Sequence, residues 1–137
     1  MNKVMIAAQK LGVPTGPAMV LTVPGRKSGK PRSTPMTPFE FDGGLYVVAG
    51  YPGADWAANA RAAGTGTLSR GRRSRRVKIV ELTAEQARPV LRTFPVEVPV
   101  GVAFAKSSGM VVDGTSDEFE ALAGRIAVFR FDPVAPT

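Results

Sequence analysis

Two extended segments meet in the stretch Leu21-Thr22-Val23-Pro24-Gly25-Arg26-Lys27-Ser28-Gly29-Lys30-Pro31-Arg32. Residues 18–23 form an apolar run with Gly-Pro before it and Pro-Gly after it, which predicts a first β-strand. A second extended segment follows at residues 32–41, and its prolines at 35 and 38 favour a sheet edge or a bulge. The turn between the segments carries two glycines, four cationic side chains and one serine.

Turn and capping signals divide the remaining chain into short elements. The expected elements are a strand at residues 45–49, a helix at 56–63 capped by Asp55 and stopped by Gly64, strands at 65–69 and 76–82, a helix from Thr83-Ala84 to near Phe94-Pro95, a short helix capped by Thr115 and ending at Gly124, and a strand at 126–131. Residues 95–114, rich in valine, glycine and proline, are expected to form an irregular connection. About six antiparallel strands with short helices over the barrel openings predict a mainly β (α+β) fold.

The length and composition are typical of one globular domain. The chain has 137 residues, of which 44% are hydrophobic and 21% charged. We expect a single domain over residues 1–137, with residues 1–17 as an N-terminal helix or arm. No apolar run is long enough to cross a bilayer and no signal-peptide pattern opens the chain, so a cytoplasmic location is expected.

The chain contains neither cysteine nor histidine. Their absence excludes disulfides, thiolate nucleophiles, Ser-His-Asp triads and most transition-metal sites, so no metal site is expected. An enzyme of this composition needs a bound organic cofactor as its reactive centre, with the protein supplying binding, orientation and electrostatics.

Positive charge is concentrated in the first part of the chain. Residues 1–80 hold 13 lysines and arginines against three acids, whereas residues 81–137 hold five against eight. Such a localised field indicates an anionic ligand, a nucleic acid or an anionic membrane surface, and charge alone does not choose among them.

The turn at residues 25–32 has the composition of an anion-binding loop. Glycine permits the backbone conformations that aim N–H groups at an anion, and arginine can bind phosphate oxygens through two hydrogen bonds. The spacing is not that of a Walker A motif, because three residues separate Gly25 from Gly29 and Pro31 follows Lys30. An exposed basic hairpin turn is the alternative interpretation.

Three segments together resemble a known family. These are residues 21–36, Leu45-Tyr46-Val47-Val48-Ala49 and Trp56-Ala57-Ala58-Asn59-Ala60-Arg61. Their order and spacing resemble the deazaflavin-dependent nitroreductases of actinobacteria over residues 18–82, and more loosely to residue 132. The resemblance implies a split β-barrel of the FMN-binding type and the cofactor coenzyme F-420, a deazaflavin with a phosphate and an oligoglutamate tail. FMN is the less favoured cofactor.

The resemblance also implies a set of cofactor-binding residues. By position, the residues that would hold the tail are Arg26, Lys27, Ser28, Lys30 and Arg32. The ring would lie beside Ala49, Gly50 and Tyr51, and Trp56 and Asn59 would lie next to the cofactor. Gly29 and Pro35 complete the set. The implied reaction is hydride transfer to a lipophilic acceptor such as a quinone, a nitroaromatic compound or an activated alkene.

Two departures from the family pattern leave the chemistry open. The segment between Gly50 and Trp56 is shorter than is common in the family, and no tyrosine follows Tyr51, although better-studied members line the acceptor pocket with C-terminal tyrosines. No catalytic residue is assigned; Tyr51 is the one candidate proton donor, against its interpretation as a loop residue covering the barrel. The alternative function is a non-catalytic binder of a lipid, a fatty acid or another flavin.

The densest positive charge is the run Arg70-Gly71-Arg72-Arg73-Ser74-Arg75-Arg76. A solvated hairpin turn is one interpretation, and attraction to the anionic inner face of a membrane is the other. Nucleic-acid binding is disfavoured because no recognition helix or run of stacking aromatics accompanies the arginines. The sequence leaves open whether the protein is a monomer or a homodimer.

Overall fold

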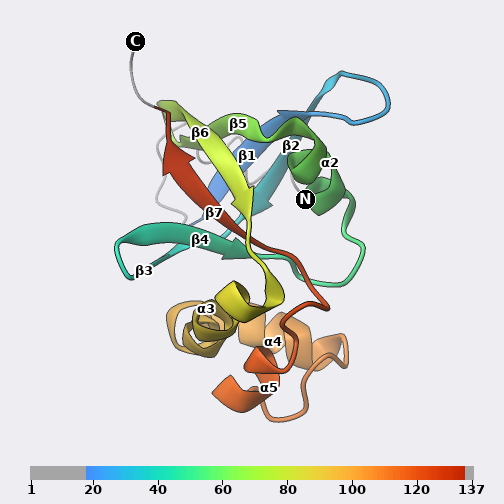
Figure 1. Ribbon diagram of the computed structural model, residues 1–137, viewed down its shortest axis with the longest axis vertical. Helices are drawn as coiled ribbons and strands as arrows, with labels where there is room; N and C mark the ends of the chain where they lie inside the picture. The colour runs from blue at the N-terminus through green and yellow to red at the C-terminus, as the bar shows by residue number, and fades with distance from the viewer. Residues whose placement is uncertain (1–17, 135–137) are drawn as a thin grey trace.

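The described residues form a curled, seven-stranded antiparallel sheet (Figure 1). The computed structural model describes residues 18–134, so the expected N-terminal helix or arm lies outside the described residues. The strands are β1 (Met19–Pro24), β2 (Pro31–Met36), β3 (Phe39–Phe41), β4 (Gly44–Val48), β5 (Thr65–Arg70), β6 (Arg73–Glu81) and β7 (Val128–Pro133). Their order across the sheet is β2-β1-β5-β6-β7-β4-β3.

The helices lie in two places. Helix α2 (Asp55–Ala63) packs on β1, β5 and β6, and its Ala57 and Ala60 belong to the core inside the curled sheet. Helices α3 (Ala84–Glu97), α4 (Pro99–Ser107) and α5 (Ser116–Glu120) gather at the other end of the molecule (Figure 1). They enclose a second core, which Phe39 and Val128 join from the sheet. The site described below lies where these two cores meet.

The expected second strand is in fact two strands. Residues 32–41 split at Thr37-Pro38 into β2 and β3, which occupy opposite edges of the sheet. Proline has no N–H to donate to a ladder, so an edge strand tolerates Pro35, which stands opposite Val20 of β1. Because β2 and β3 are not hydrogen-bonded to each other, the barrel is a curled half-barrel with one strand more than expected and is not closed.

The capping signals are confirmed for α3 and α5 and partly for α2. Thr83 and Gln86 form a reciprocal capping box at the start of α3. Gly64 ends α2 in the left-handed conformation, with φ of 73°. The N-cap of α2 is Ala54 and not Asp55, because Asp55 is already the first helical residue and its carboxylate points to Arg26.

The prediction of an irregular connection at residues 95–114 is wrong. Helix α3 continues past Pro95 to Glu97, and α4 follows almost at once. Pro99 occupies the first turn of α4, where its missing N–H costs no hydrogen bond. Gly101 lets α4 approach α3, because a Cβ there would overlap the Phe94 ring. Burial of these apolar residues outweighs the low helix propensity of proline and glycine. The last helix is also shorter than expected, ending at Glu120.

Candidate functional site

An apolar pocket of about 340 Å³ lies between the barrel and helices α3 and α4. The barrel side includes four residues singled out from the sequence, Pro35, Ala49, Gly50 and Trp56. The helical side includes Phe94, Val98, Val100, Gly101 and Phe104, none of which the sequence analysis had assigned to a site. The signal for this wall is the helical spacing of the apolar residues Val98, Val102 and Ala105, which begins just before Pro99.

The basic loop (residues 25–32) is a closed, ordered turn. The backbone N–H of Gly25 donates to the carbonyl oxygen of Lys30 at 2.8 Å, and that of Gly29 donates to the carbonyl oxygen of Gly25 at 2.9 Å. Gly29 has φ of 73°, a conformation that favours glycine. The hydroxyl oxygen of Ser28 accepts the Lys30 N–H at 3.2 Å, and its own hydrogen stays available to a ligand.

Three of the four cationic side chains of the loop are exposed to solvent. Lys27, Lys30 and Arg32 are exposed, and none of them forms an ion pair within the part of the chain that the structure describes. Their positive charge is therefore not neutralised by the described part of the protein, which favours the attraction of a multiply charged anion.

Arg26, in contrast, turns inward onto helix α2. Its backbone N–H and its Nη1 both donate to Asn59 Oδ1, at 3.1 Å and 2.7 Å, and its Nη2 lies 3.4 Å from Asp55 Oδ1. Asn59 is 5% exposed and is the one buried polar side chain among residues 18–134. The residue expected to hold phosphate thus fastens the loop to α2, and Asn59 lies beneath the loop.

Helix α2 connects the basic loop to the apolar pocket. Trp56, one turn before Asn59, lines the pocket and packs on Phe129 with ring centroids 5.6 Å apart. A helical turn separates the residue that holds the loop from the residue that faces the pocket. The same helix therefore carries a residue that holds the loop and a residue that lines the pocket.

Ala49 and Gly50 form the floor where the chain leaves β4. Ala49 is buried, and its N–H donates to the carbonyl oxygen of Ala127 at 2.9 Å. Gly50 lies so close to α4 that a Cβ there would stand 3.1 Å from Cε2 of Phe104. A side chain at residue 50 would therefore narrow the pocket.

Tyr51 does not face the apolar pocket. Its side chain is 49% exposed and lines a separate pocket of about 340 Å³, together with Arg61, Glu81 and Arg125. The structure therefore brings together eleven of the twelve residues in two adjoining groups, the loop group and the pocket group, and leaves out Tyr51.

Two carboxylates accept hydrogen bonds that connect chain segments near the site. Glu81 of β6 accepts two hydrogen bonds from Arg61 of α2, at 2.6 Å and 2.7 Å, and these lower its pKa. Glu118 accepts four backbone N–H groups, from Val112, Thr115, Asp113 and Gly114, and these lower its pKa to about 2. The hydrogen bonds to Glu118 hold together residues 112–115, which follow the pocket residue Met110.

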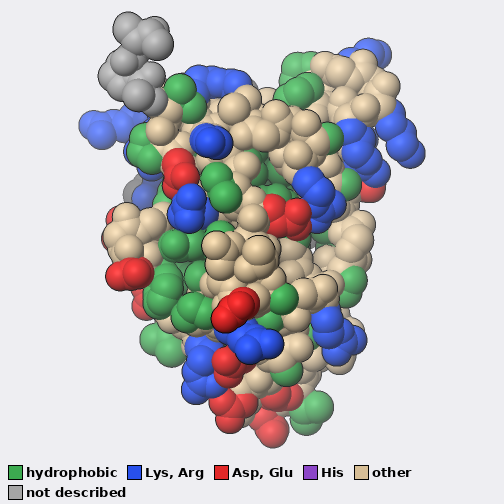
Figure 2. Space-filling model, viewed as in Figure 1, with side chains coloured by type: hydrophobic (Ala, Val, Ile, Leu, Met, Phe, Trp, Pro, Cys, Tyr) green, Lys and Arg blue, Asp and Glu red, His purple; other side chains and the backbone are tan. Residues whose placement is uncertain are grey.

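No group of side chains with the make-up of a metal site occurs within residues 18–134. None of the helices in this range is long and apolar enough to span a membrane. Acidic side chains are most numerous at the end formed by α3 to α5, where lysine and arginine side chains also lie, and further lysine and arginine side chains lie over the barrel end (Figure 2).

Solved structures with the same fold cover almost the whole chain. One, described as a domain-swapped dimer, has a TM-score of 0.60 and 21% identity, covering 95% of this chain and 92% of its own. An F420-H2 dependent reductase, FDR-A, has a TM-score of 0.57 and 21% identity, covering 85% and 94%. A NimC/NimA family protein from Clostridium acetobutylicum has a TM-score of 0.56 and 18% identity, covering 94% and 81%. At these identities the likeness shows the fold, a split β-barrel of the FMN-binding type.

No curated protein sequence is significantly similar to this chain. The sequence profile of the F420H(2)-dependent quinone reductases, however, matches residues 3–110, which include the basic loop, α2 and all pocket-lining residues except Phe119 and Ile126. The chain therefore belongs to the F420H(2)-dependent quinone reductase family and is a deazaflavin-dependent oxidoreductase.

Proposed function

We propose that this enzyme reduces a small lipophilic acceptor, a quinone in the first instance, in the apolar pocket beside Trp56 and Gly50. The anionic tail of the deazaflavin would lie on the basic loop. The observation that carries the proposal is the connection, through helix α2, of an apolar pocket to a loop with three cations that form no ion pair among residues 18–134.

The donors of the loop fit the cofactor tail. Lys27, Lys30 and Arg32 offer exposed positive charge and form no ion pair among residues 18–134, and Ser28 offers a hydroxyl hydrogen. These four residues would hold the phosphate and the tail carboxylates. Arg26 would keep the loop in position through Asn59, and it would contribute to the tail site mainly by its charge.

The pocket fits the ring and an acceptor. Pro35, Ala49 and Gly50 present little more than backbone and small apolar surface, which permits the close approach of a flat ring. Trp56 adds an aromatic face beside them. When bound, the reduced coenzyme supplies the hydride, while these residues fix distance and orientation and exclude water.

The pocket holds no titratable side chain among its described lining residues. Thr37 supplies the single side-chain hydroxyl, and Trp56 supplies an indole N–H. The chain can therefore orient a polar acceptor atom, but the proton that completes a two-electron reduction must come from water. Quinones suit this arrangement because their reduced oxygens take protons readily from solvent. Tyr51 as a proton donor stays a prediction, and its place outside the pocket does not support it.

The test combines binding and turnover. Purified protein is titrated with the deazaflavin while Trp56 fluorescence is followed, and oxidation of the reduced cofactor by a soluble quinone is followed by absorbance. The Lys27→Ala/Lys30→Ala variant should bind the cofactor at least about tenfold more weakly, because it removes two charge-assisted contacts. Lys78→Ala and Arg88→Ala, two exposed cations elsewhere, provide the matched control.

Unchanged affinity in the loop variant would contradict the assignment of the tail site. Tight cofactor binding without oxidation by any quinone, nitroaromatic or activated alkene would contradict the proposed reaction. A fatty acid or another flavin retained in native mass spectra, with no deazaflavin affinity, would instead support the alternative of a non-catalytic binder.

A further inference from the structure

A second cavity adjoins the apolar pocket, and the proposed reaction does not use it. Its volume of about 340 Å³ lies within the range of about 300 to 1,000 Å³ that is usual for small-molecule sites. Its polar and charged lining residues are Tyr51, Arg61, Glu81 and Arg125. We propose that this cavity, called the Arg125 cavity below, binds a small organic monocarboxylate.

The described lining of the Arg125 cavity carries one positive charge that no acid balances. Arg61 donates two hydrogen bonds to Glu81, at 2.6 Å and 2.7 Å, so these two charges neutralise each other. Arg125, the other arginine of the lining, forms neither an ion pair nor a side-chain hydrogen bond among residues 18–134. One guanidinium without a partner matches a ligand with one anionic group.

The backbone at Arg125 is held in place although its side chain is exposed. Its N–H donates to the carbonyl oxygen of Leu122 at 2.8 Å, and the N–H of Ile126 donates to the same oxygen at 3.2 Å. Ile126 is buried in the second core. An ordered turn therefore carries the guanidinium, so that binding has to order a side chain but not a chain segment.

Small side chains create the space in the Arg125 cavity. Eight of its lining residues are alanine or glycine, namely Ala49, Gly53, Ala54, Ala57, Ala58, Ala87, Gly124 and Ala127. Their methyl groups and backbone offer a largely apolar surface for the body of a small organic molecule. Tyr51 adds a hydroxyl that has no hydrogen-bond partner among residues 18–134 and can donate to an anionic oxygen.

A carboxylate suits this lining better than a phosphate. A guanidinium binds the two oxygens of a carboxylate through two parallel hydrogen bonds. A phosphate monoester carries close to two negative charges at pH 7, and its second charge would be repelled by the Glu81 carboxylate, which lines the same cavity. The charges of the lining therefore favour a monoanion.

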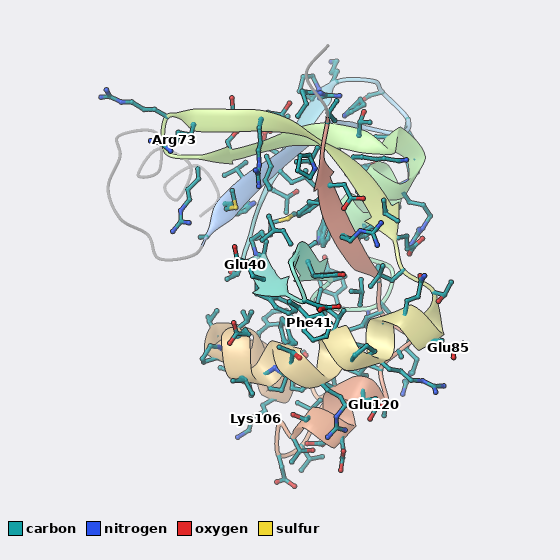
Figure 3. The ribbon with its side chains drawn as sticks, turned by 60° about the vertical axis from the view of Figure 1, so that its left-hand side comes forward. Glu40, Phe41, Arg73, Glu85, Lys106 and Glu120 are labelled. Carbon is teal, nitrogen blue, oxygen red and sulfur yellow. The ribbon has the colours of Figure 1, made fainter. Side chains whose placement is uncertain are left out.

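The Arg125 cavity is separate from the two charged regions of the barrel. None of the residues of the basic loop lines it. The first turn of α3, where Figure 3 labels Glu85, contributes Ala87 to the wall and lies away from the tip of the β5–β6 hairpin, labelled Arg73. A carboxylate bound in this cavity should therefore not occupy the tail site of the deazaflavin.

Isothermal titration of the full chain with benzoate, and with benzamide as its uncharged counterpart, tests the proposal. The wild type should bind benzoate at least about tenfold more tightly than benzamide, because only benzoate offers an anion to Arg125. Arg125→Gln should weaken benzoate binding at least about tenfold for the same reason. Ala58→Leu, which places a larger side chain in the cavity from α2, should weaken it as well.

Two variants serve as controls. Arg88→Gln removes an exposed cation of α3 that does not line the cavity, and it should bind benzoate like the wild type. The loop variant Lys27→Ala/Lys30→Ala should also keep its benzoate affinity, whereas Arg125→Gln should keep its deazaflavin affinity. These opposite responses distinguish a failure of this proposal from a failure of the proposed function.

Unchanged benzoate affinity in Arg125→Gln or in Ala58→Leu would overturn the proposal. An equal loss in Arg88→Gln would also overturn it, because net charge would then explain binding, and a loss in the loop variant would place benzoate on the basic loop instead. Inorganic phosphate bound more tightly than benzoate would contradict the choice of a monocarboxylate. Thermal melts check that each variant is folded.

Discussion

The side-chain oxygen of Asn59 accepts hydrogen bonds from both the backbone N–H and the guanidinium of Arg26, at 3.1 Å and 2.7 Å. One buried amide thereby fixes both the backbone and the side chain of Arg26, the first cationic residue of the basic loop. Because Trp56 lies one turn earlier in α2, this contact couples the tail site to the pocket. A structural contact of this kind should influence cofactor binding without touching the cofactor.

Replacing Asn59 with alanine should destabilise the protein by about 1 to 3 kcal/mol, because the part-buried Arg26 N–H loses its acceptor. Arg26→Ala should cost less, since the Asn59 oxygen keeps the backbone donor. A double-mutant cycle by urea denaturation measures the coupling between them. Additive losses would show that the Arg26 side chain contributes nothing through Asn59.

Gly50→Ala should weaken acceptor binding with little change in stability. The new Cβ would stand 3.1 Å from Phe104, and that ring, which is half exposed, can move only by changing the pocket mouth. We expect KM for a quinone and the dissociation constant of the deazaflavin both to rise, because residue 50 lies beside the ring and the acceptor in the proposed pocket. The double variant Gly50→Ala/Phe104→Leu should recover part of the loss, and a KM that stays at the wild-type value in Gly50→Ala would remove Phe104 from the acceptor site.

Gly29→Ala should weaken cofactor binding through the shape of the loop. Gly29 has φ of 73° and nothing within 4 Å of the added Cβ, so the cost is conformational strain. A side chain in the left-handed region costs about 1 to 2 kcal/mol. Gly43→Ala, with φ of 79° in the turn between β3 and β4, carries the same strain far from the loop. Isothermal titration should show weaker cofactor binding for Gly29→Ala alone, and equal affinities would mean that the loop conformation is irrelevant to the tail.

The barrel and the loop could be predicted from the sequence because their signals are local. The prolines and glycines that bound β1, the capping box at Thr83 and the αL glycine at Gly64 each act within a few residues. The family resemblance added the positions of Trp56 and Pro35, and the structure places both at the pocket.

The far wall of the pocket could not be predicted because tertiary packing forms it. The prolines and glycines of residues 95–114 indicate a loop locally, and only the second core makes α4 favourable. Arg26 illustrates a different limit. Composition shows that a cation is present at residue 26, but the orientation of its side chain depends on Asn59, which lies 33 residues away in the chain.

The hydrogen bonds that the Glu118 carboxylate accepts predict that the segment next to the pocket residue Met110 is sensitive to acid. Four backbone N–H groups lower the pKa of this carboxyl from 4.5 to about 2, so the folded state favours the ionised form. The stabilisation is complete above pH 4.5, the unfolded value, and is lost as the pH falls towards the folded value of about 2. Glu118→Gln should therefore lower Tm at neutral pH, with a difference from the wild type that shrinks as the pH falls through this window. Thermal melts from neutral to acid pH measure it, with Glu97→Gln, an exposed carboxylate without a hydrogen-bonding partner among residues 18–134, as the control. A Tm difference that stays constant across the window would mean that the ionised carboxylate does not hold this segment in place.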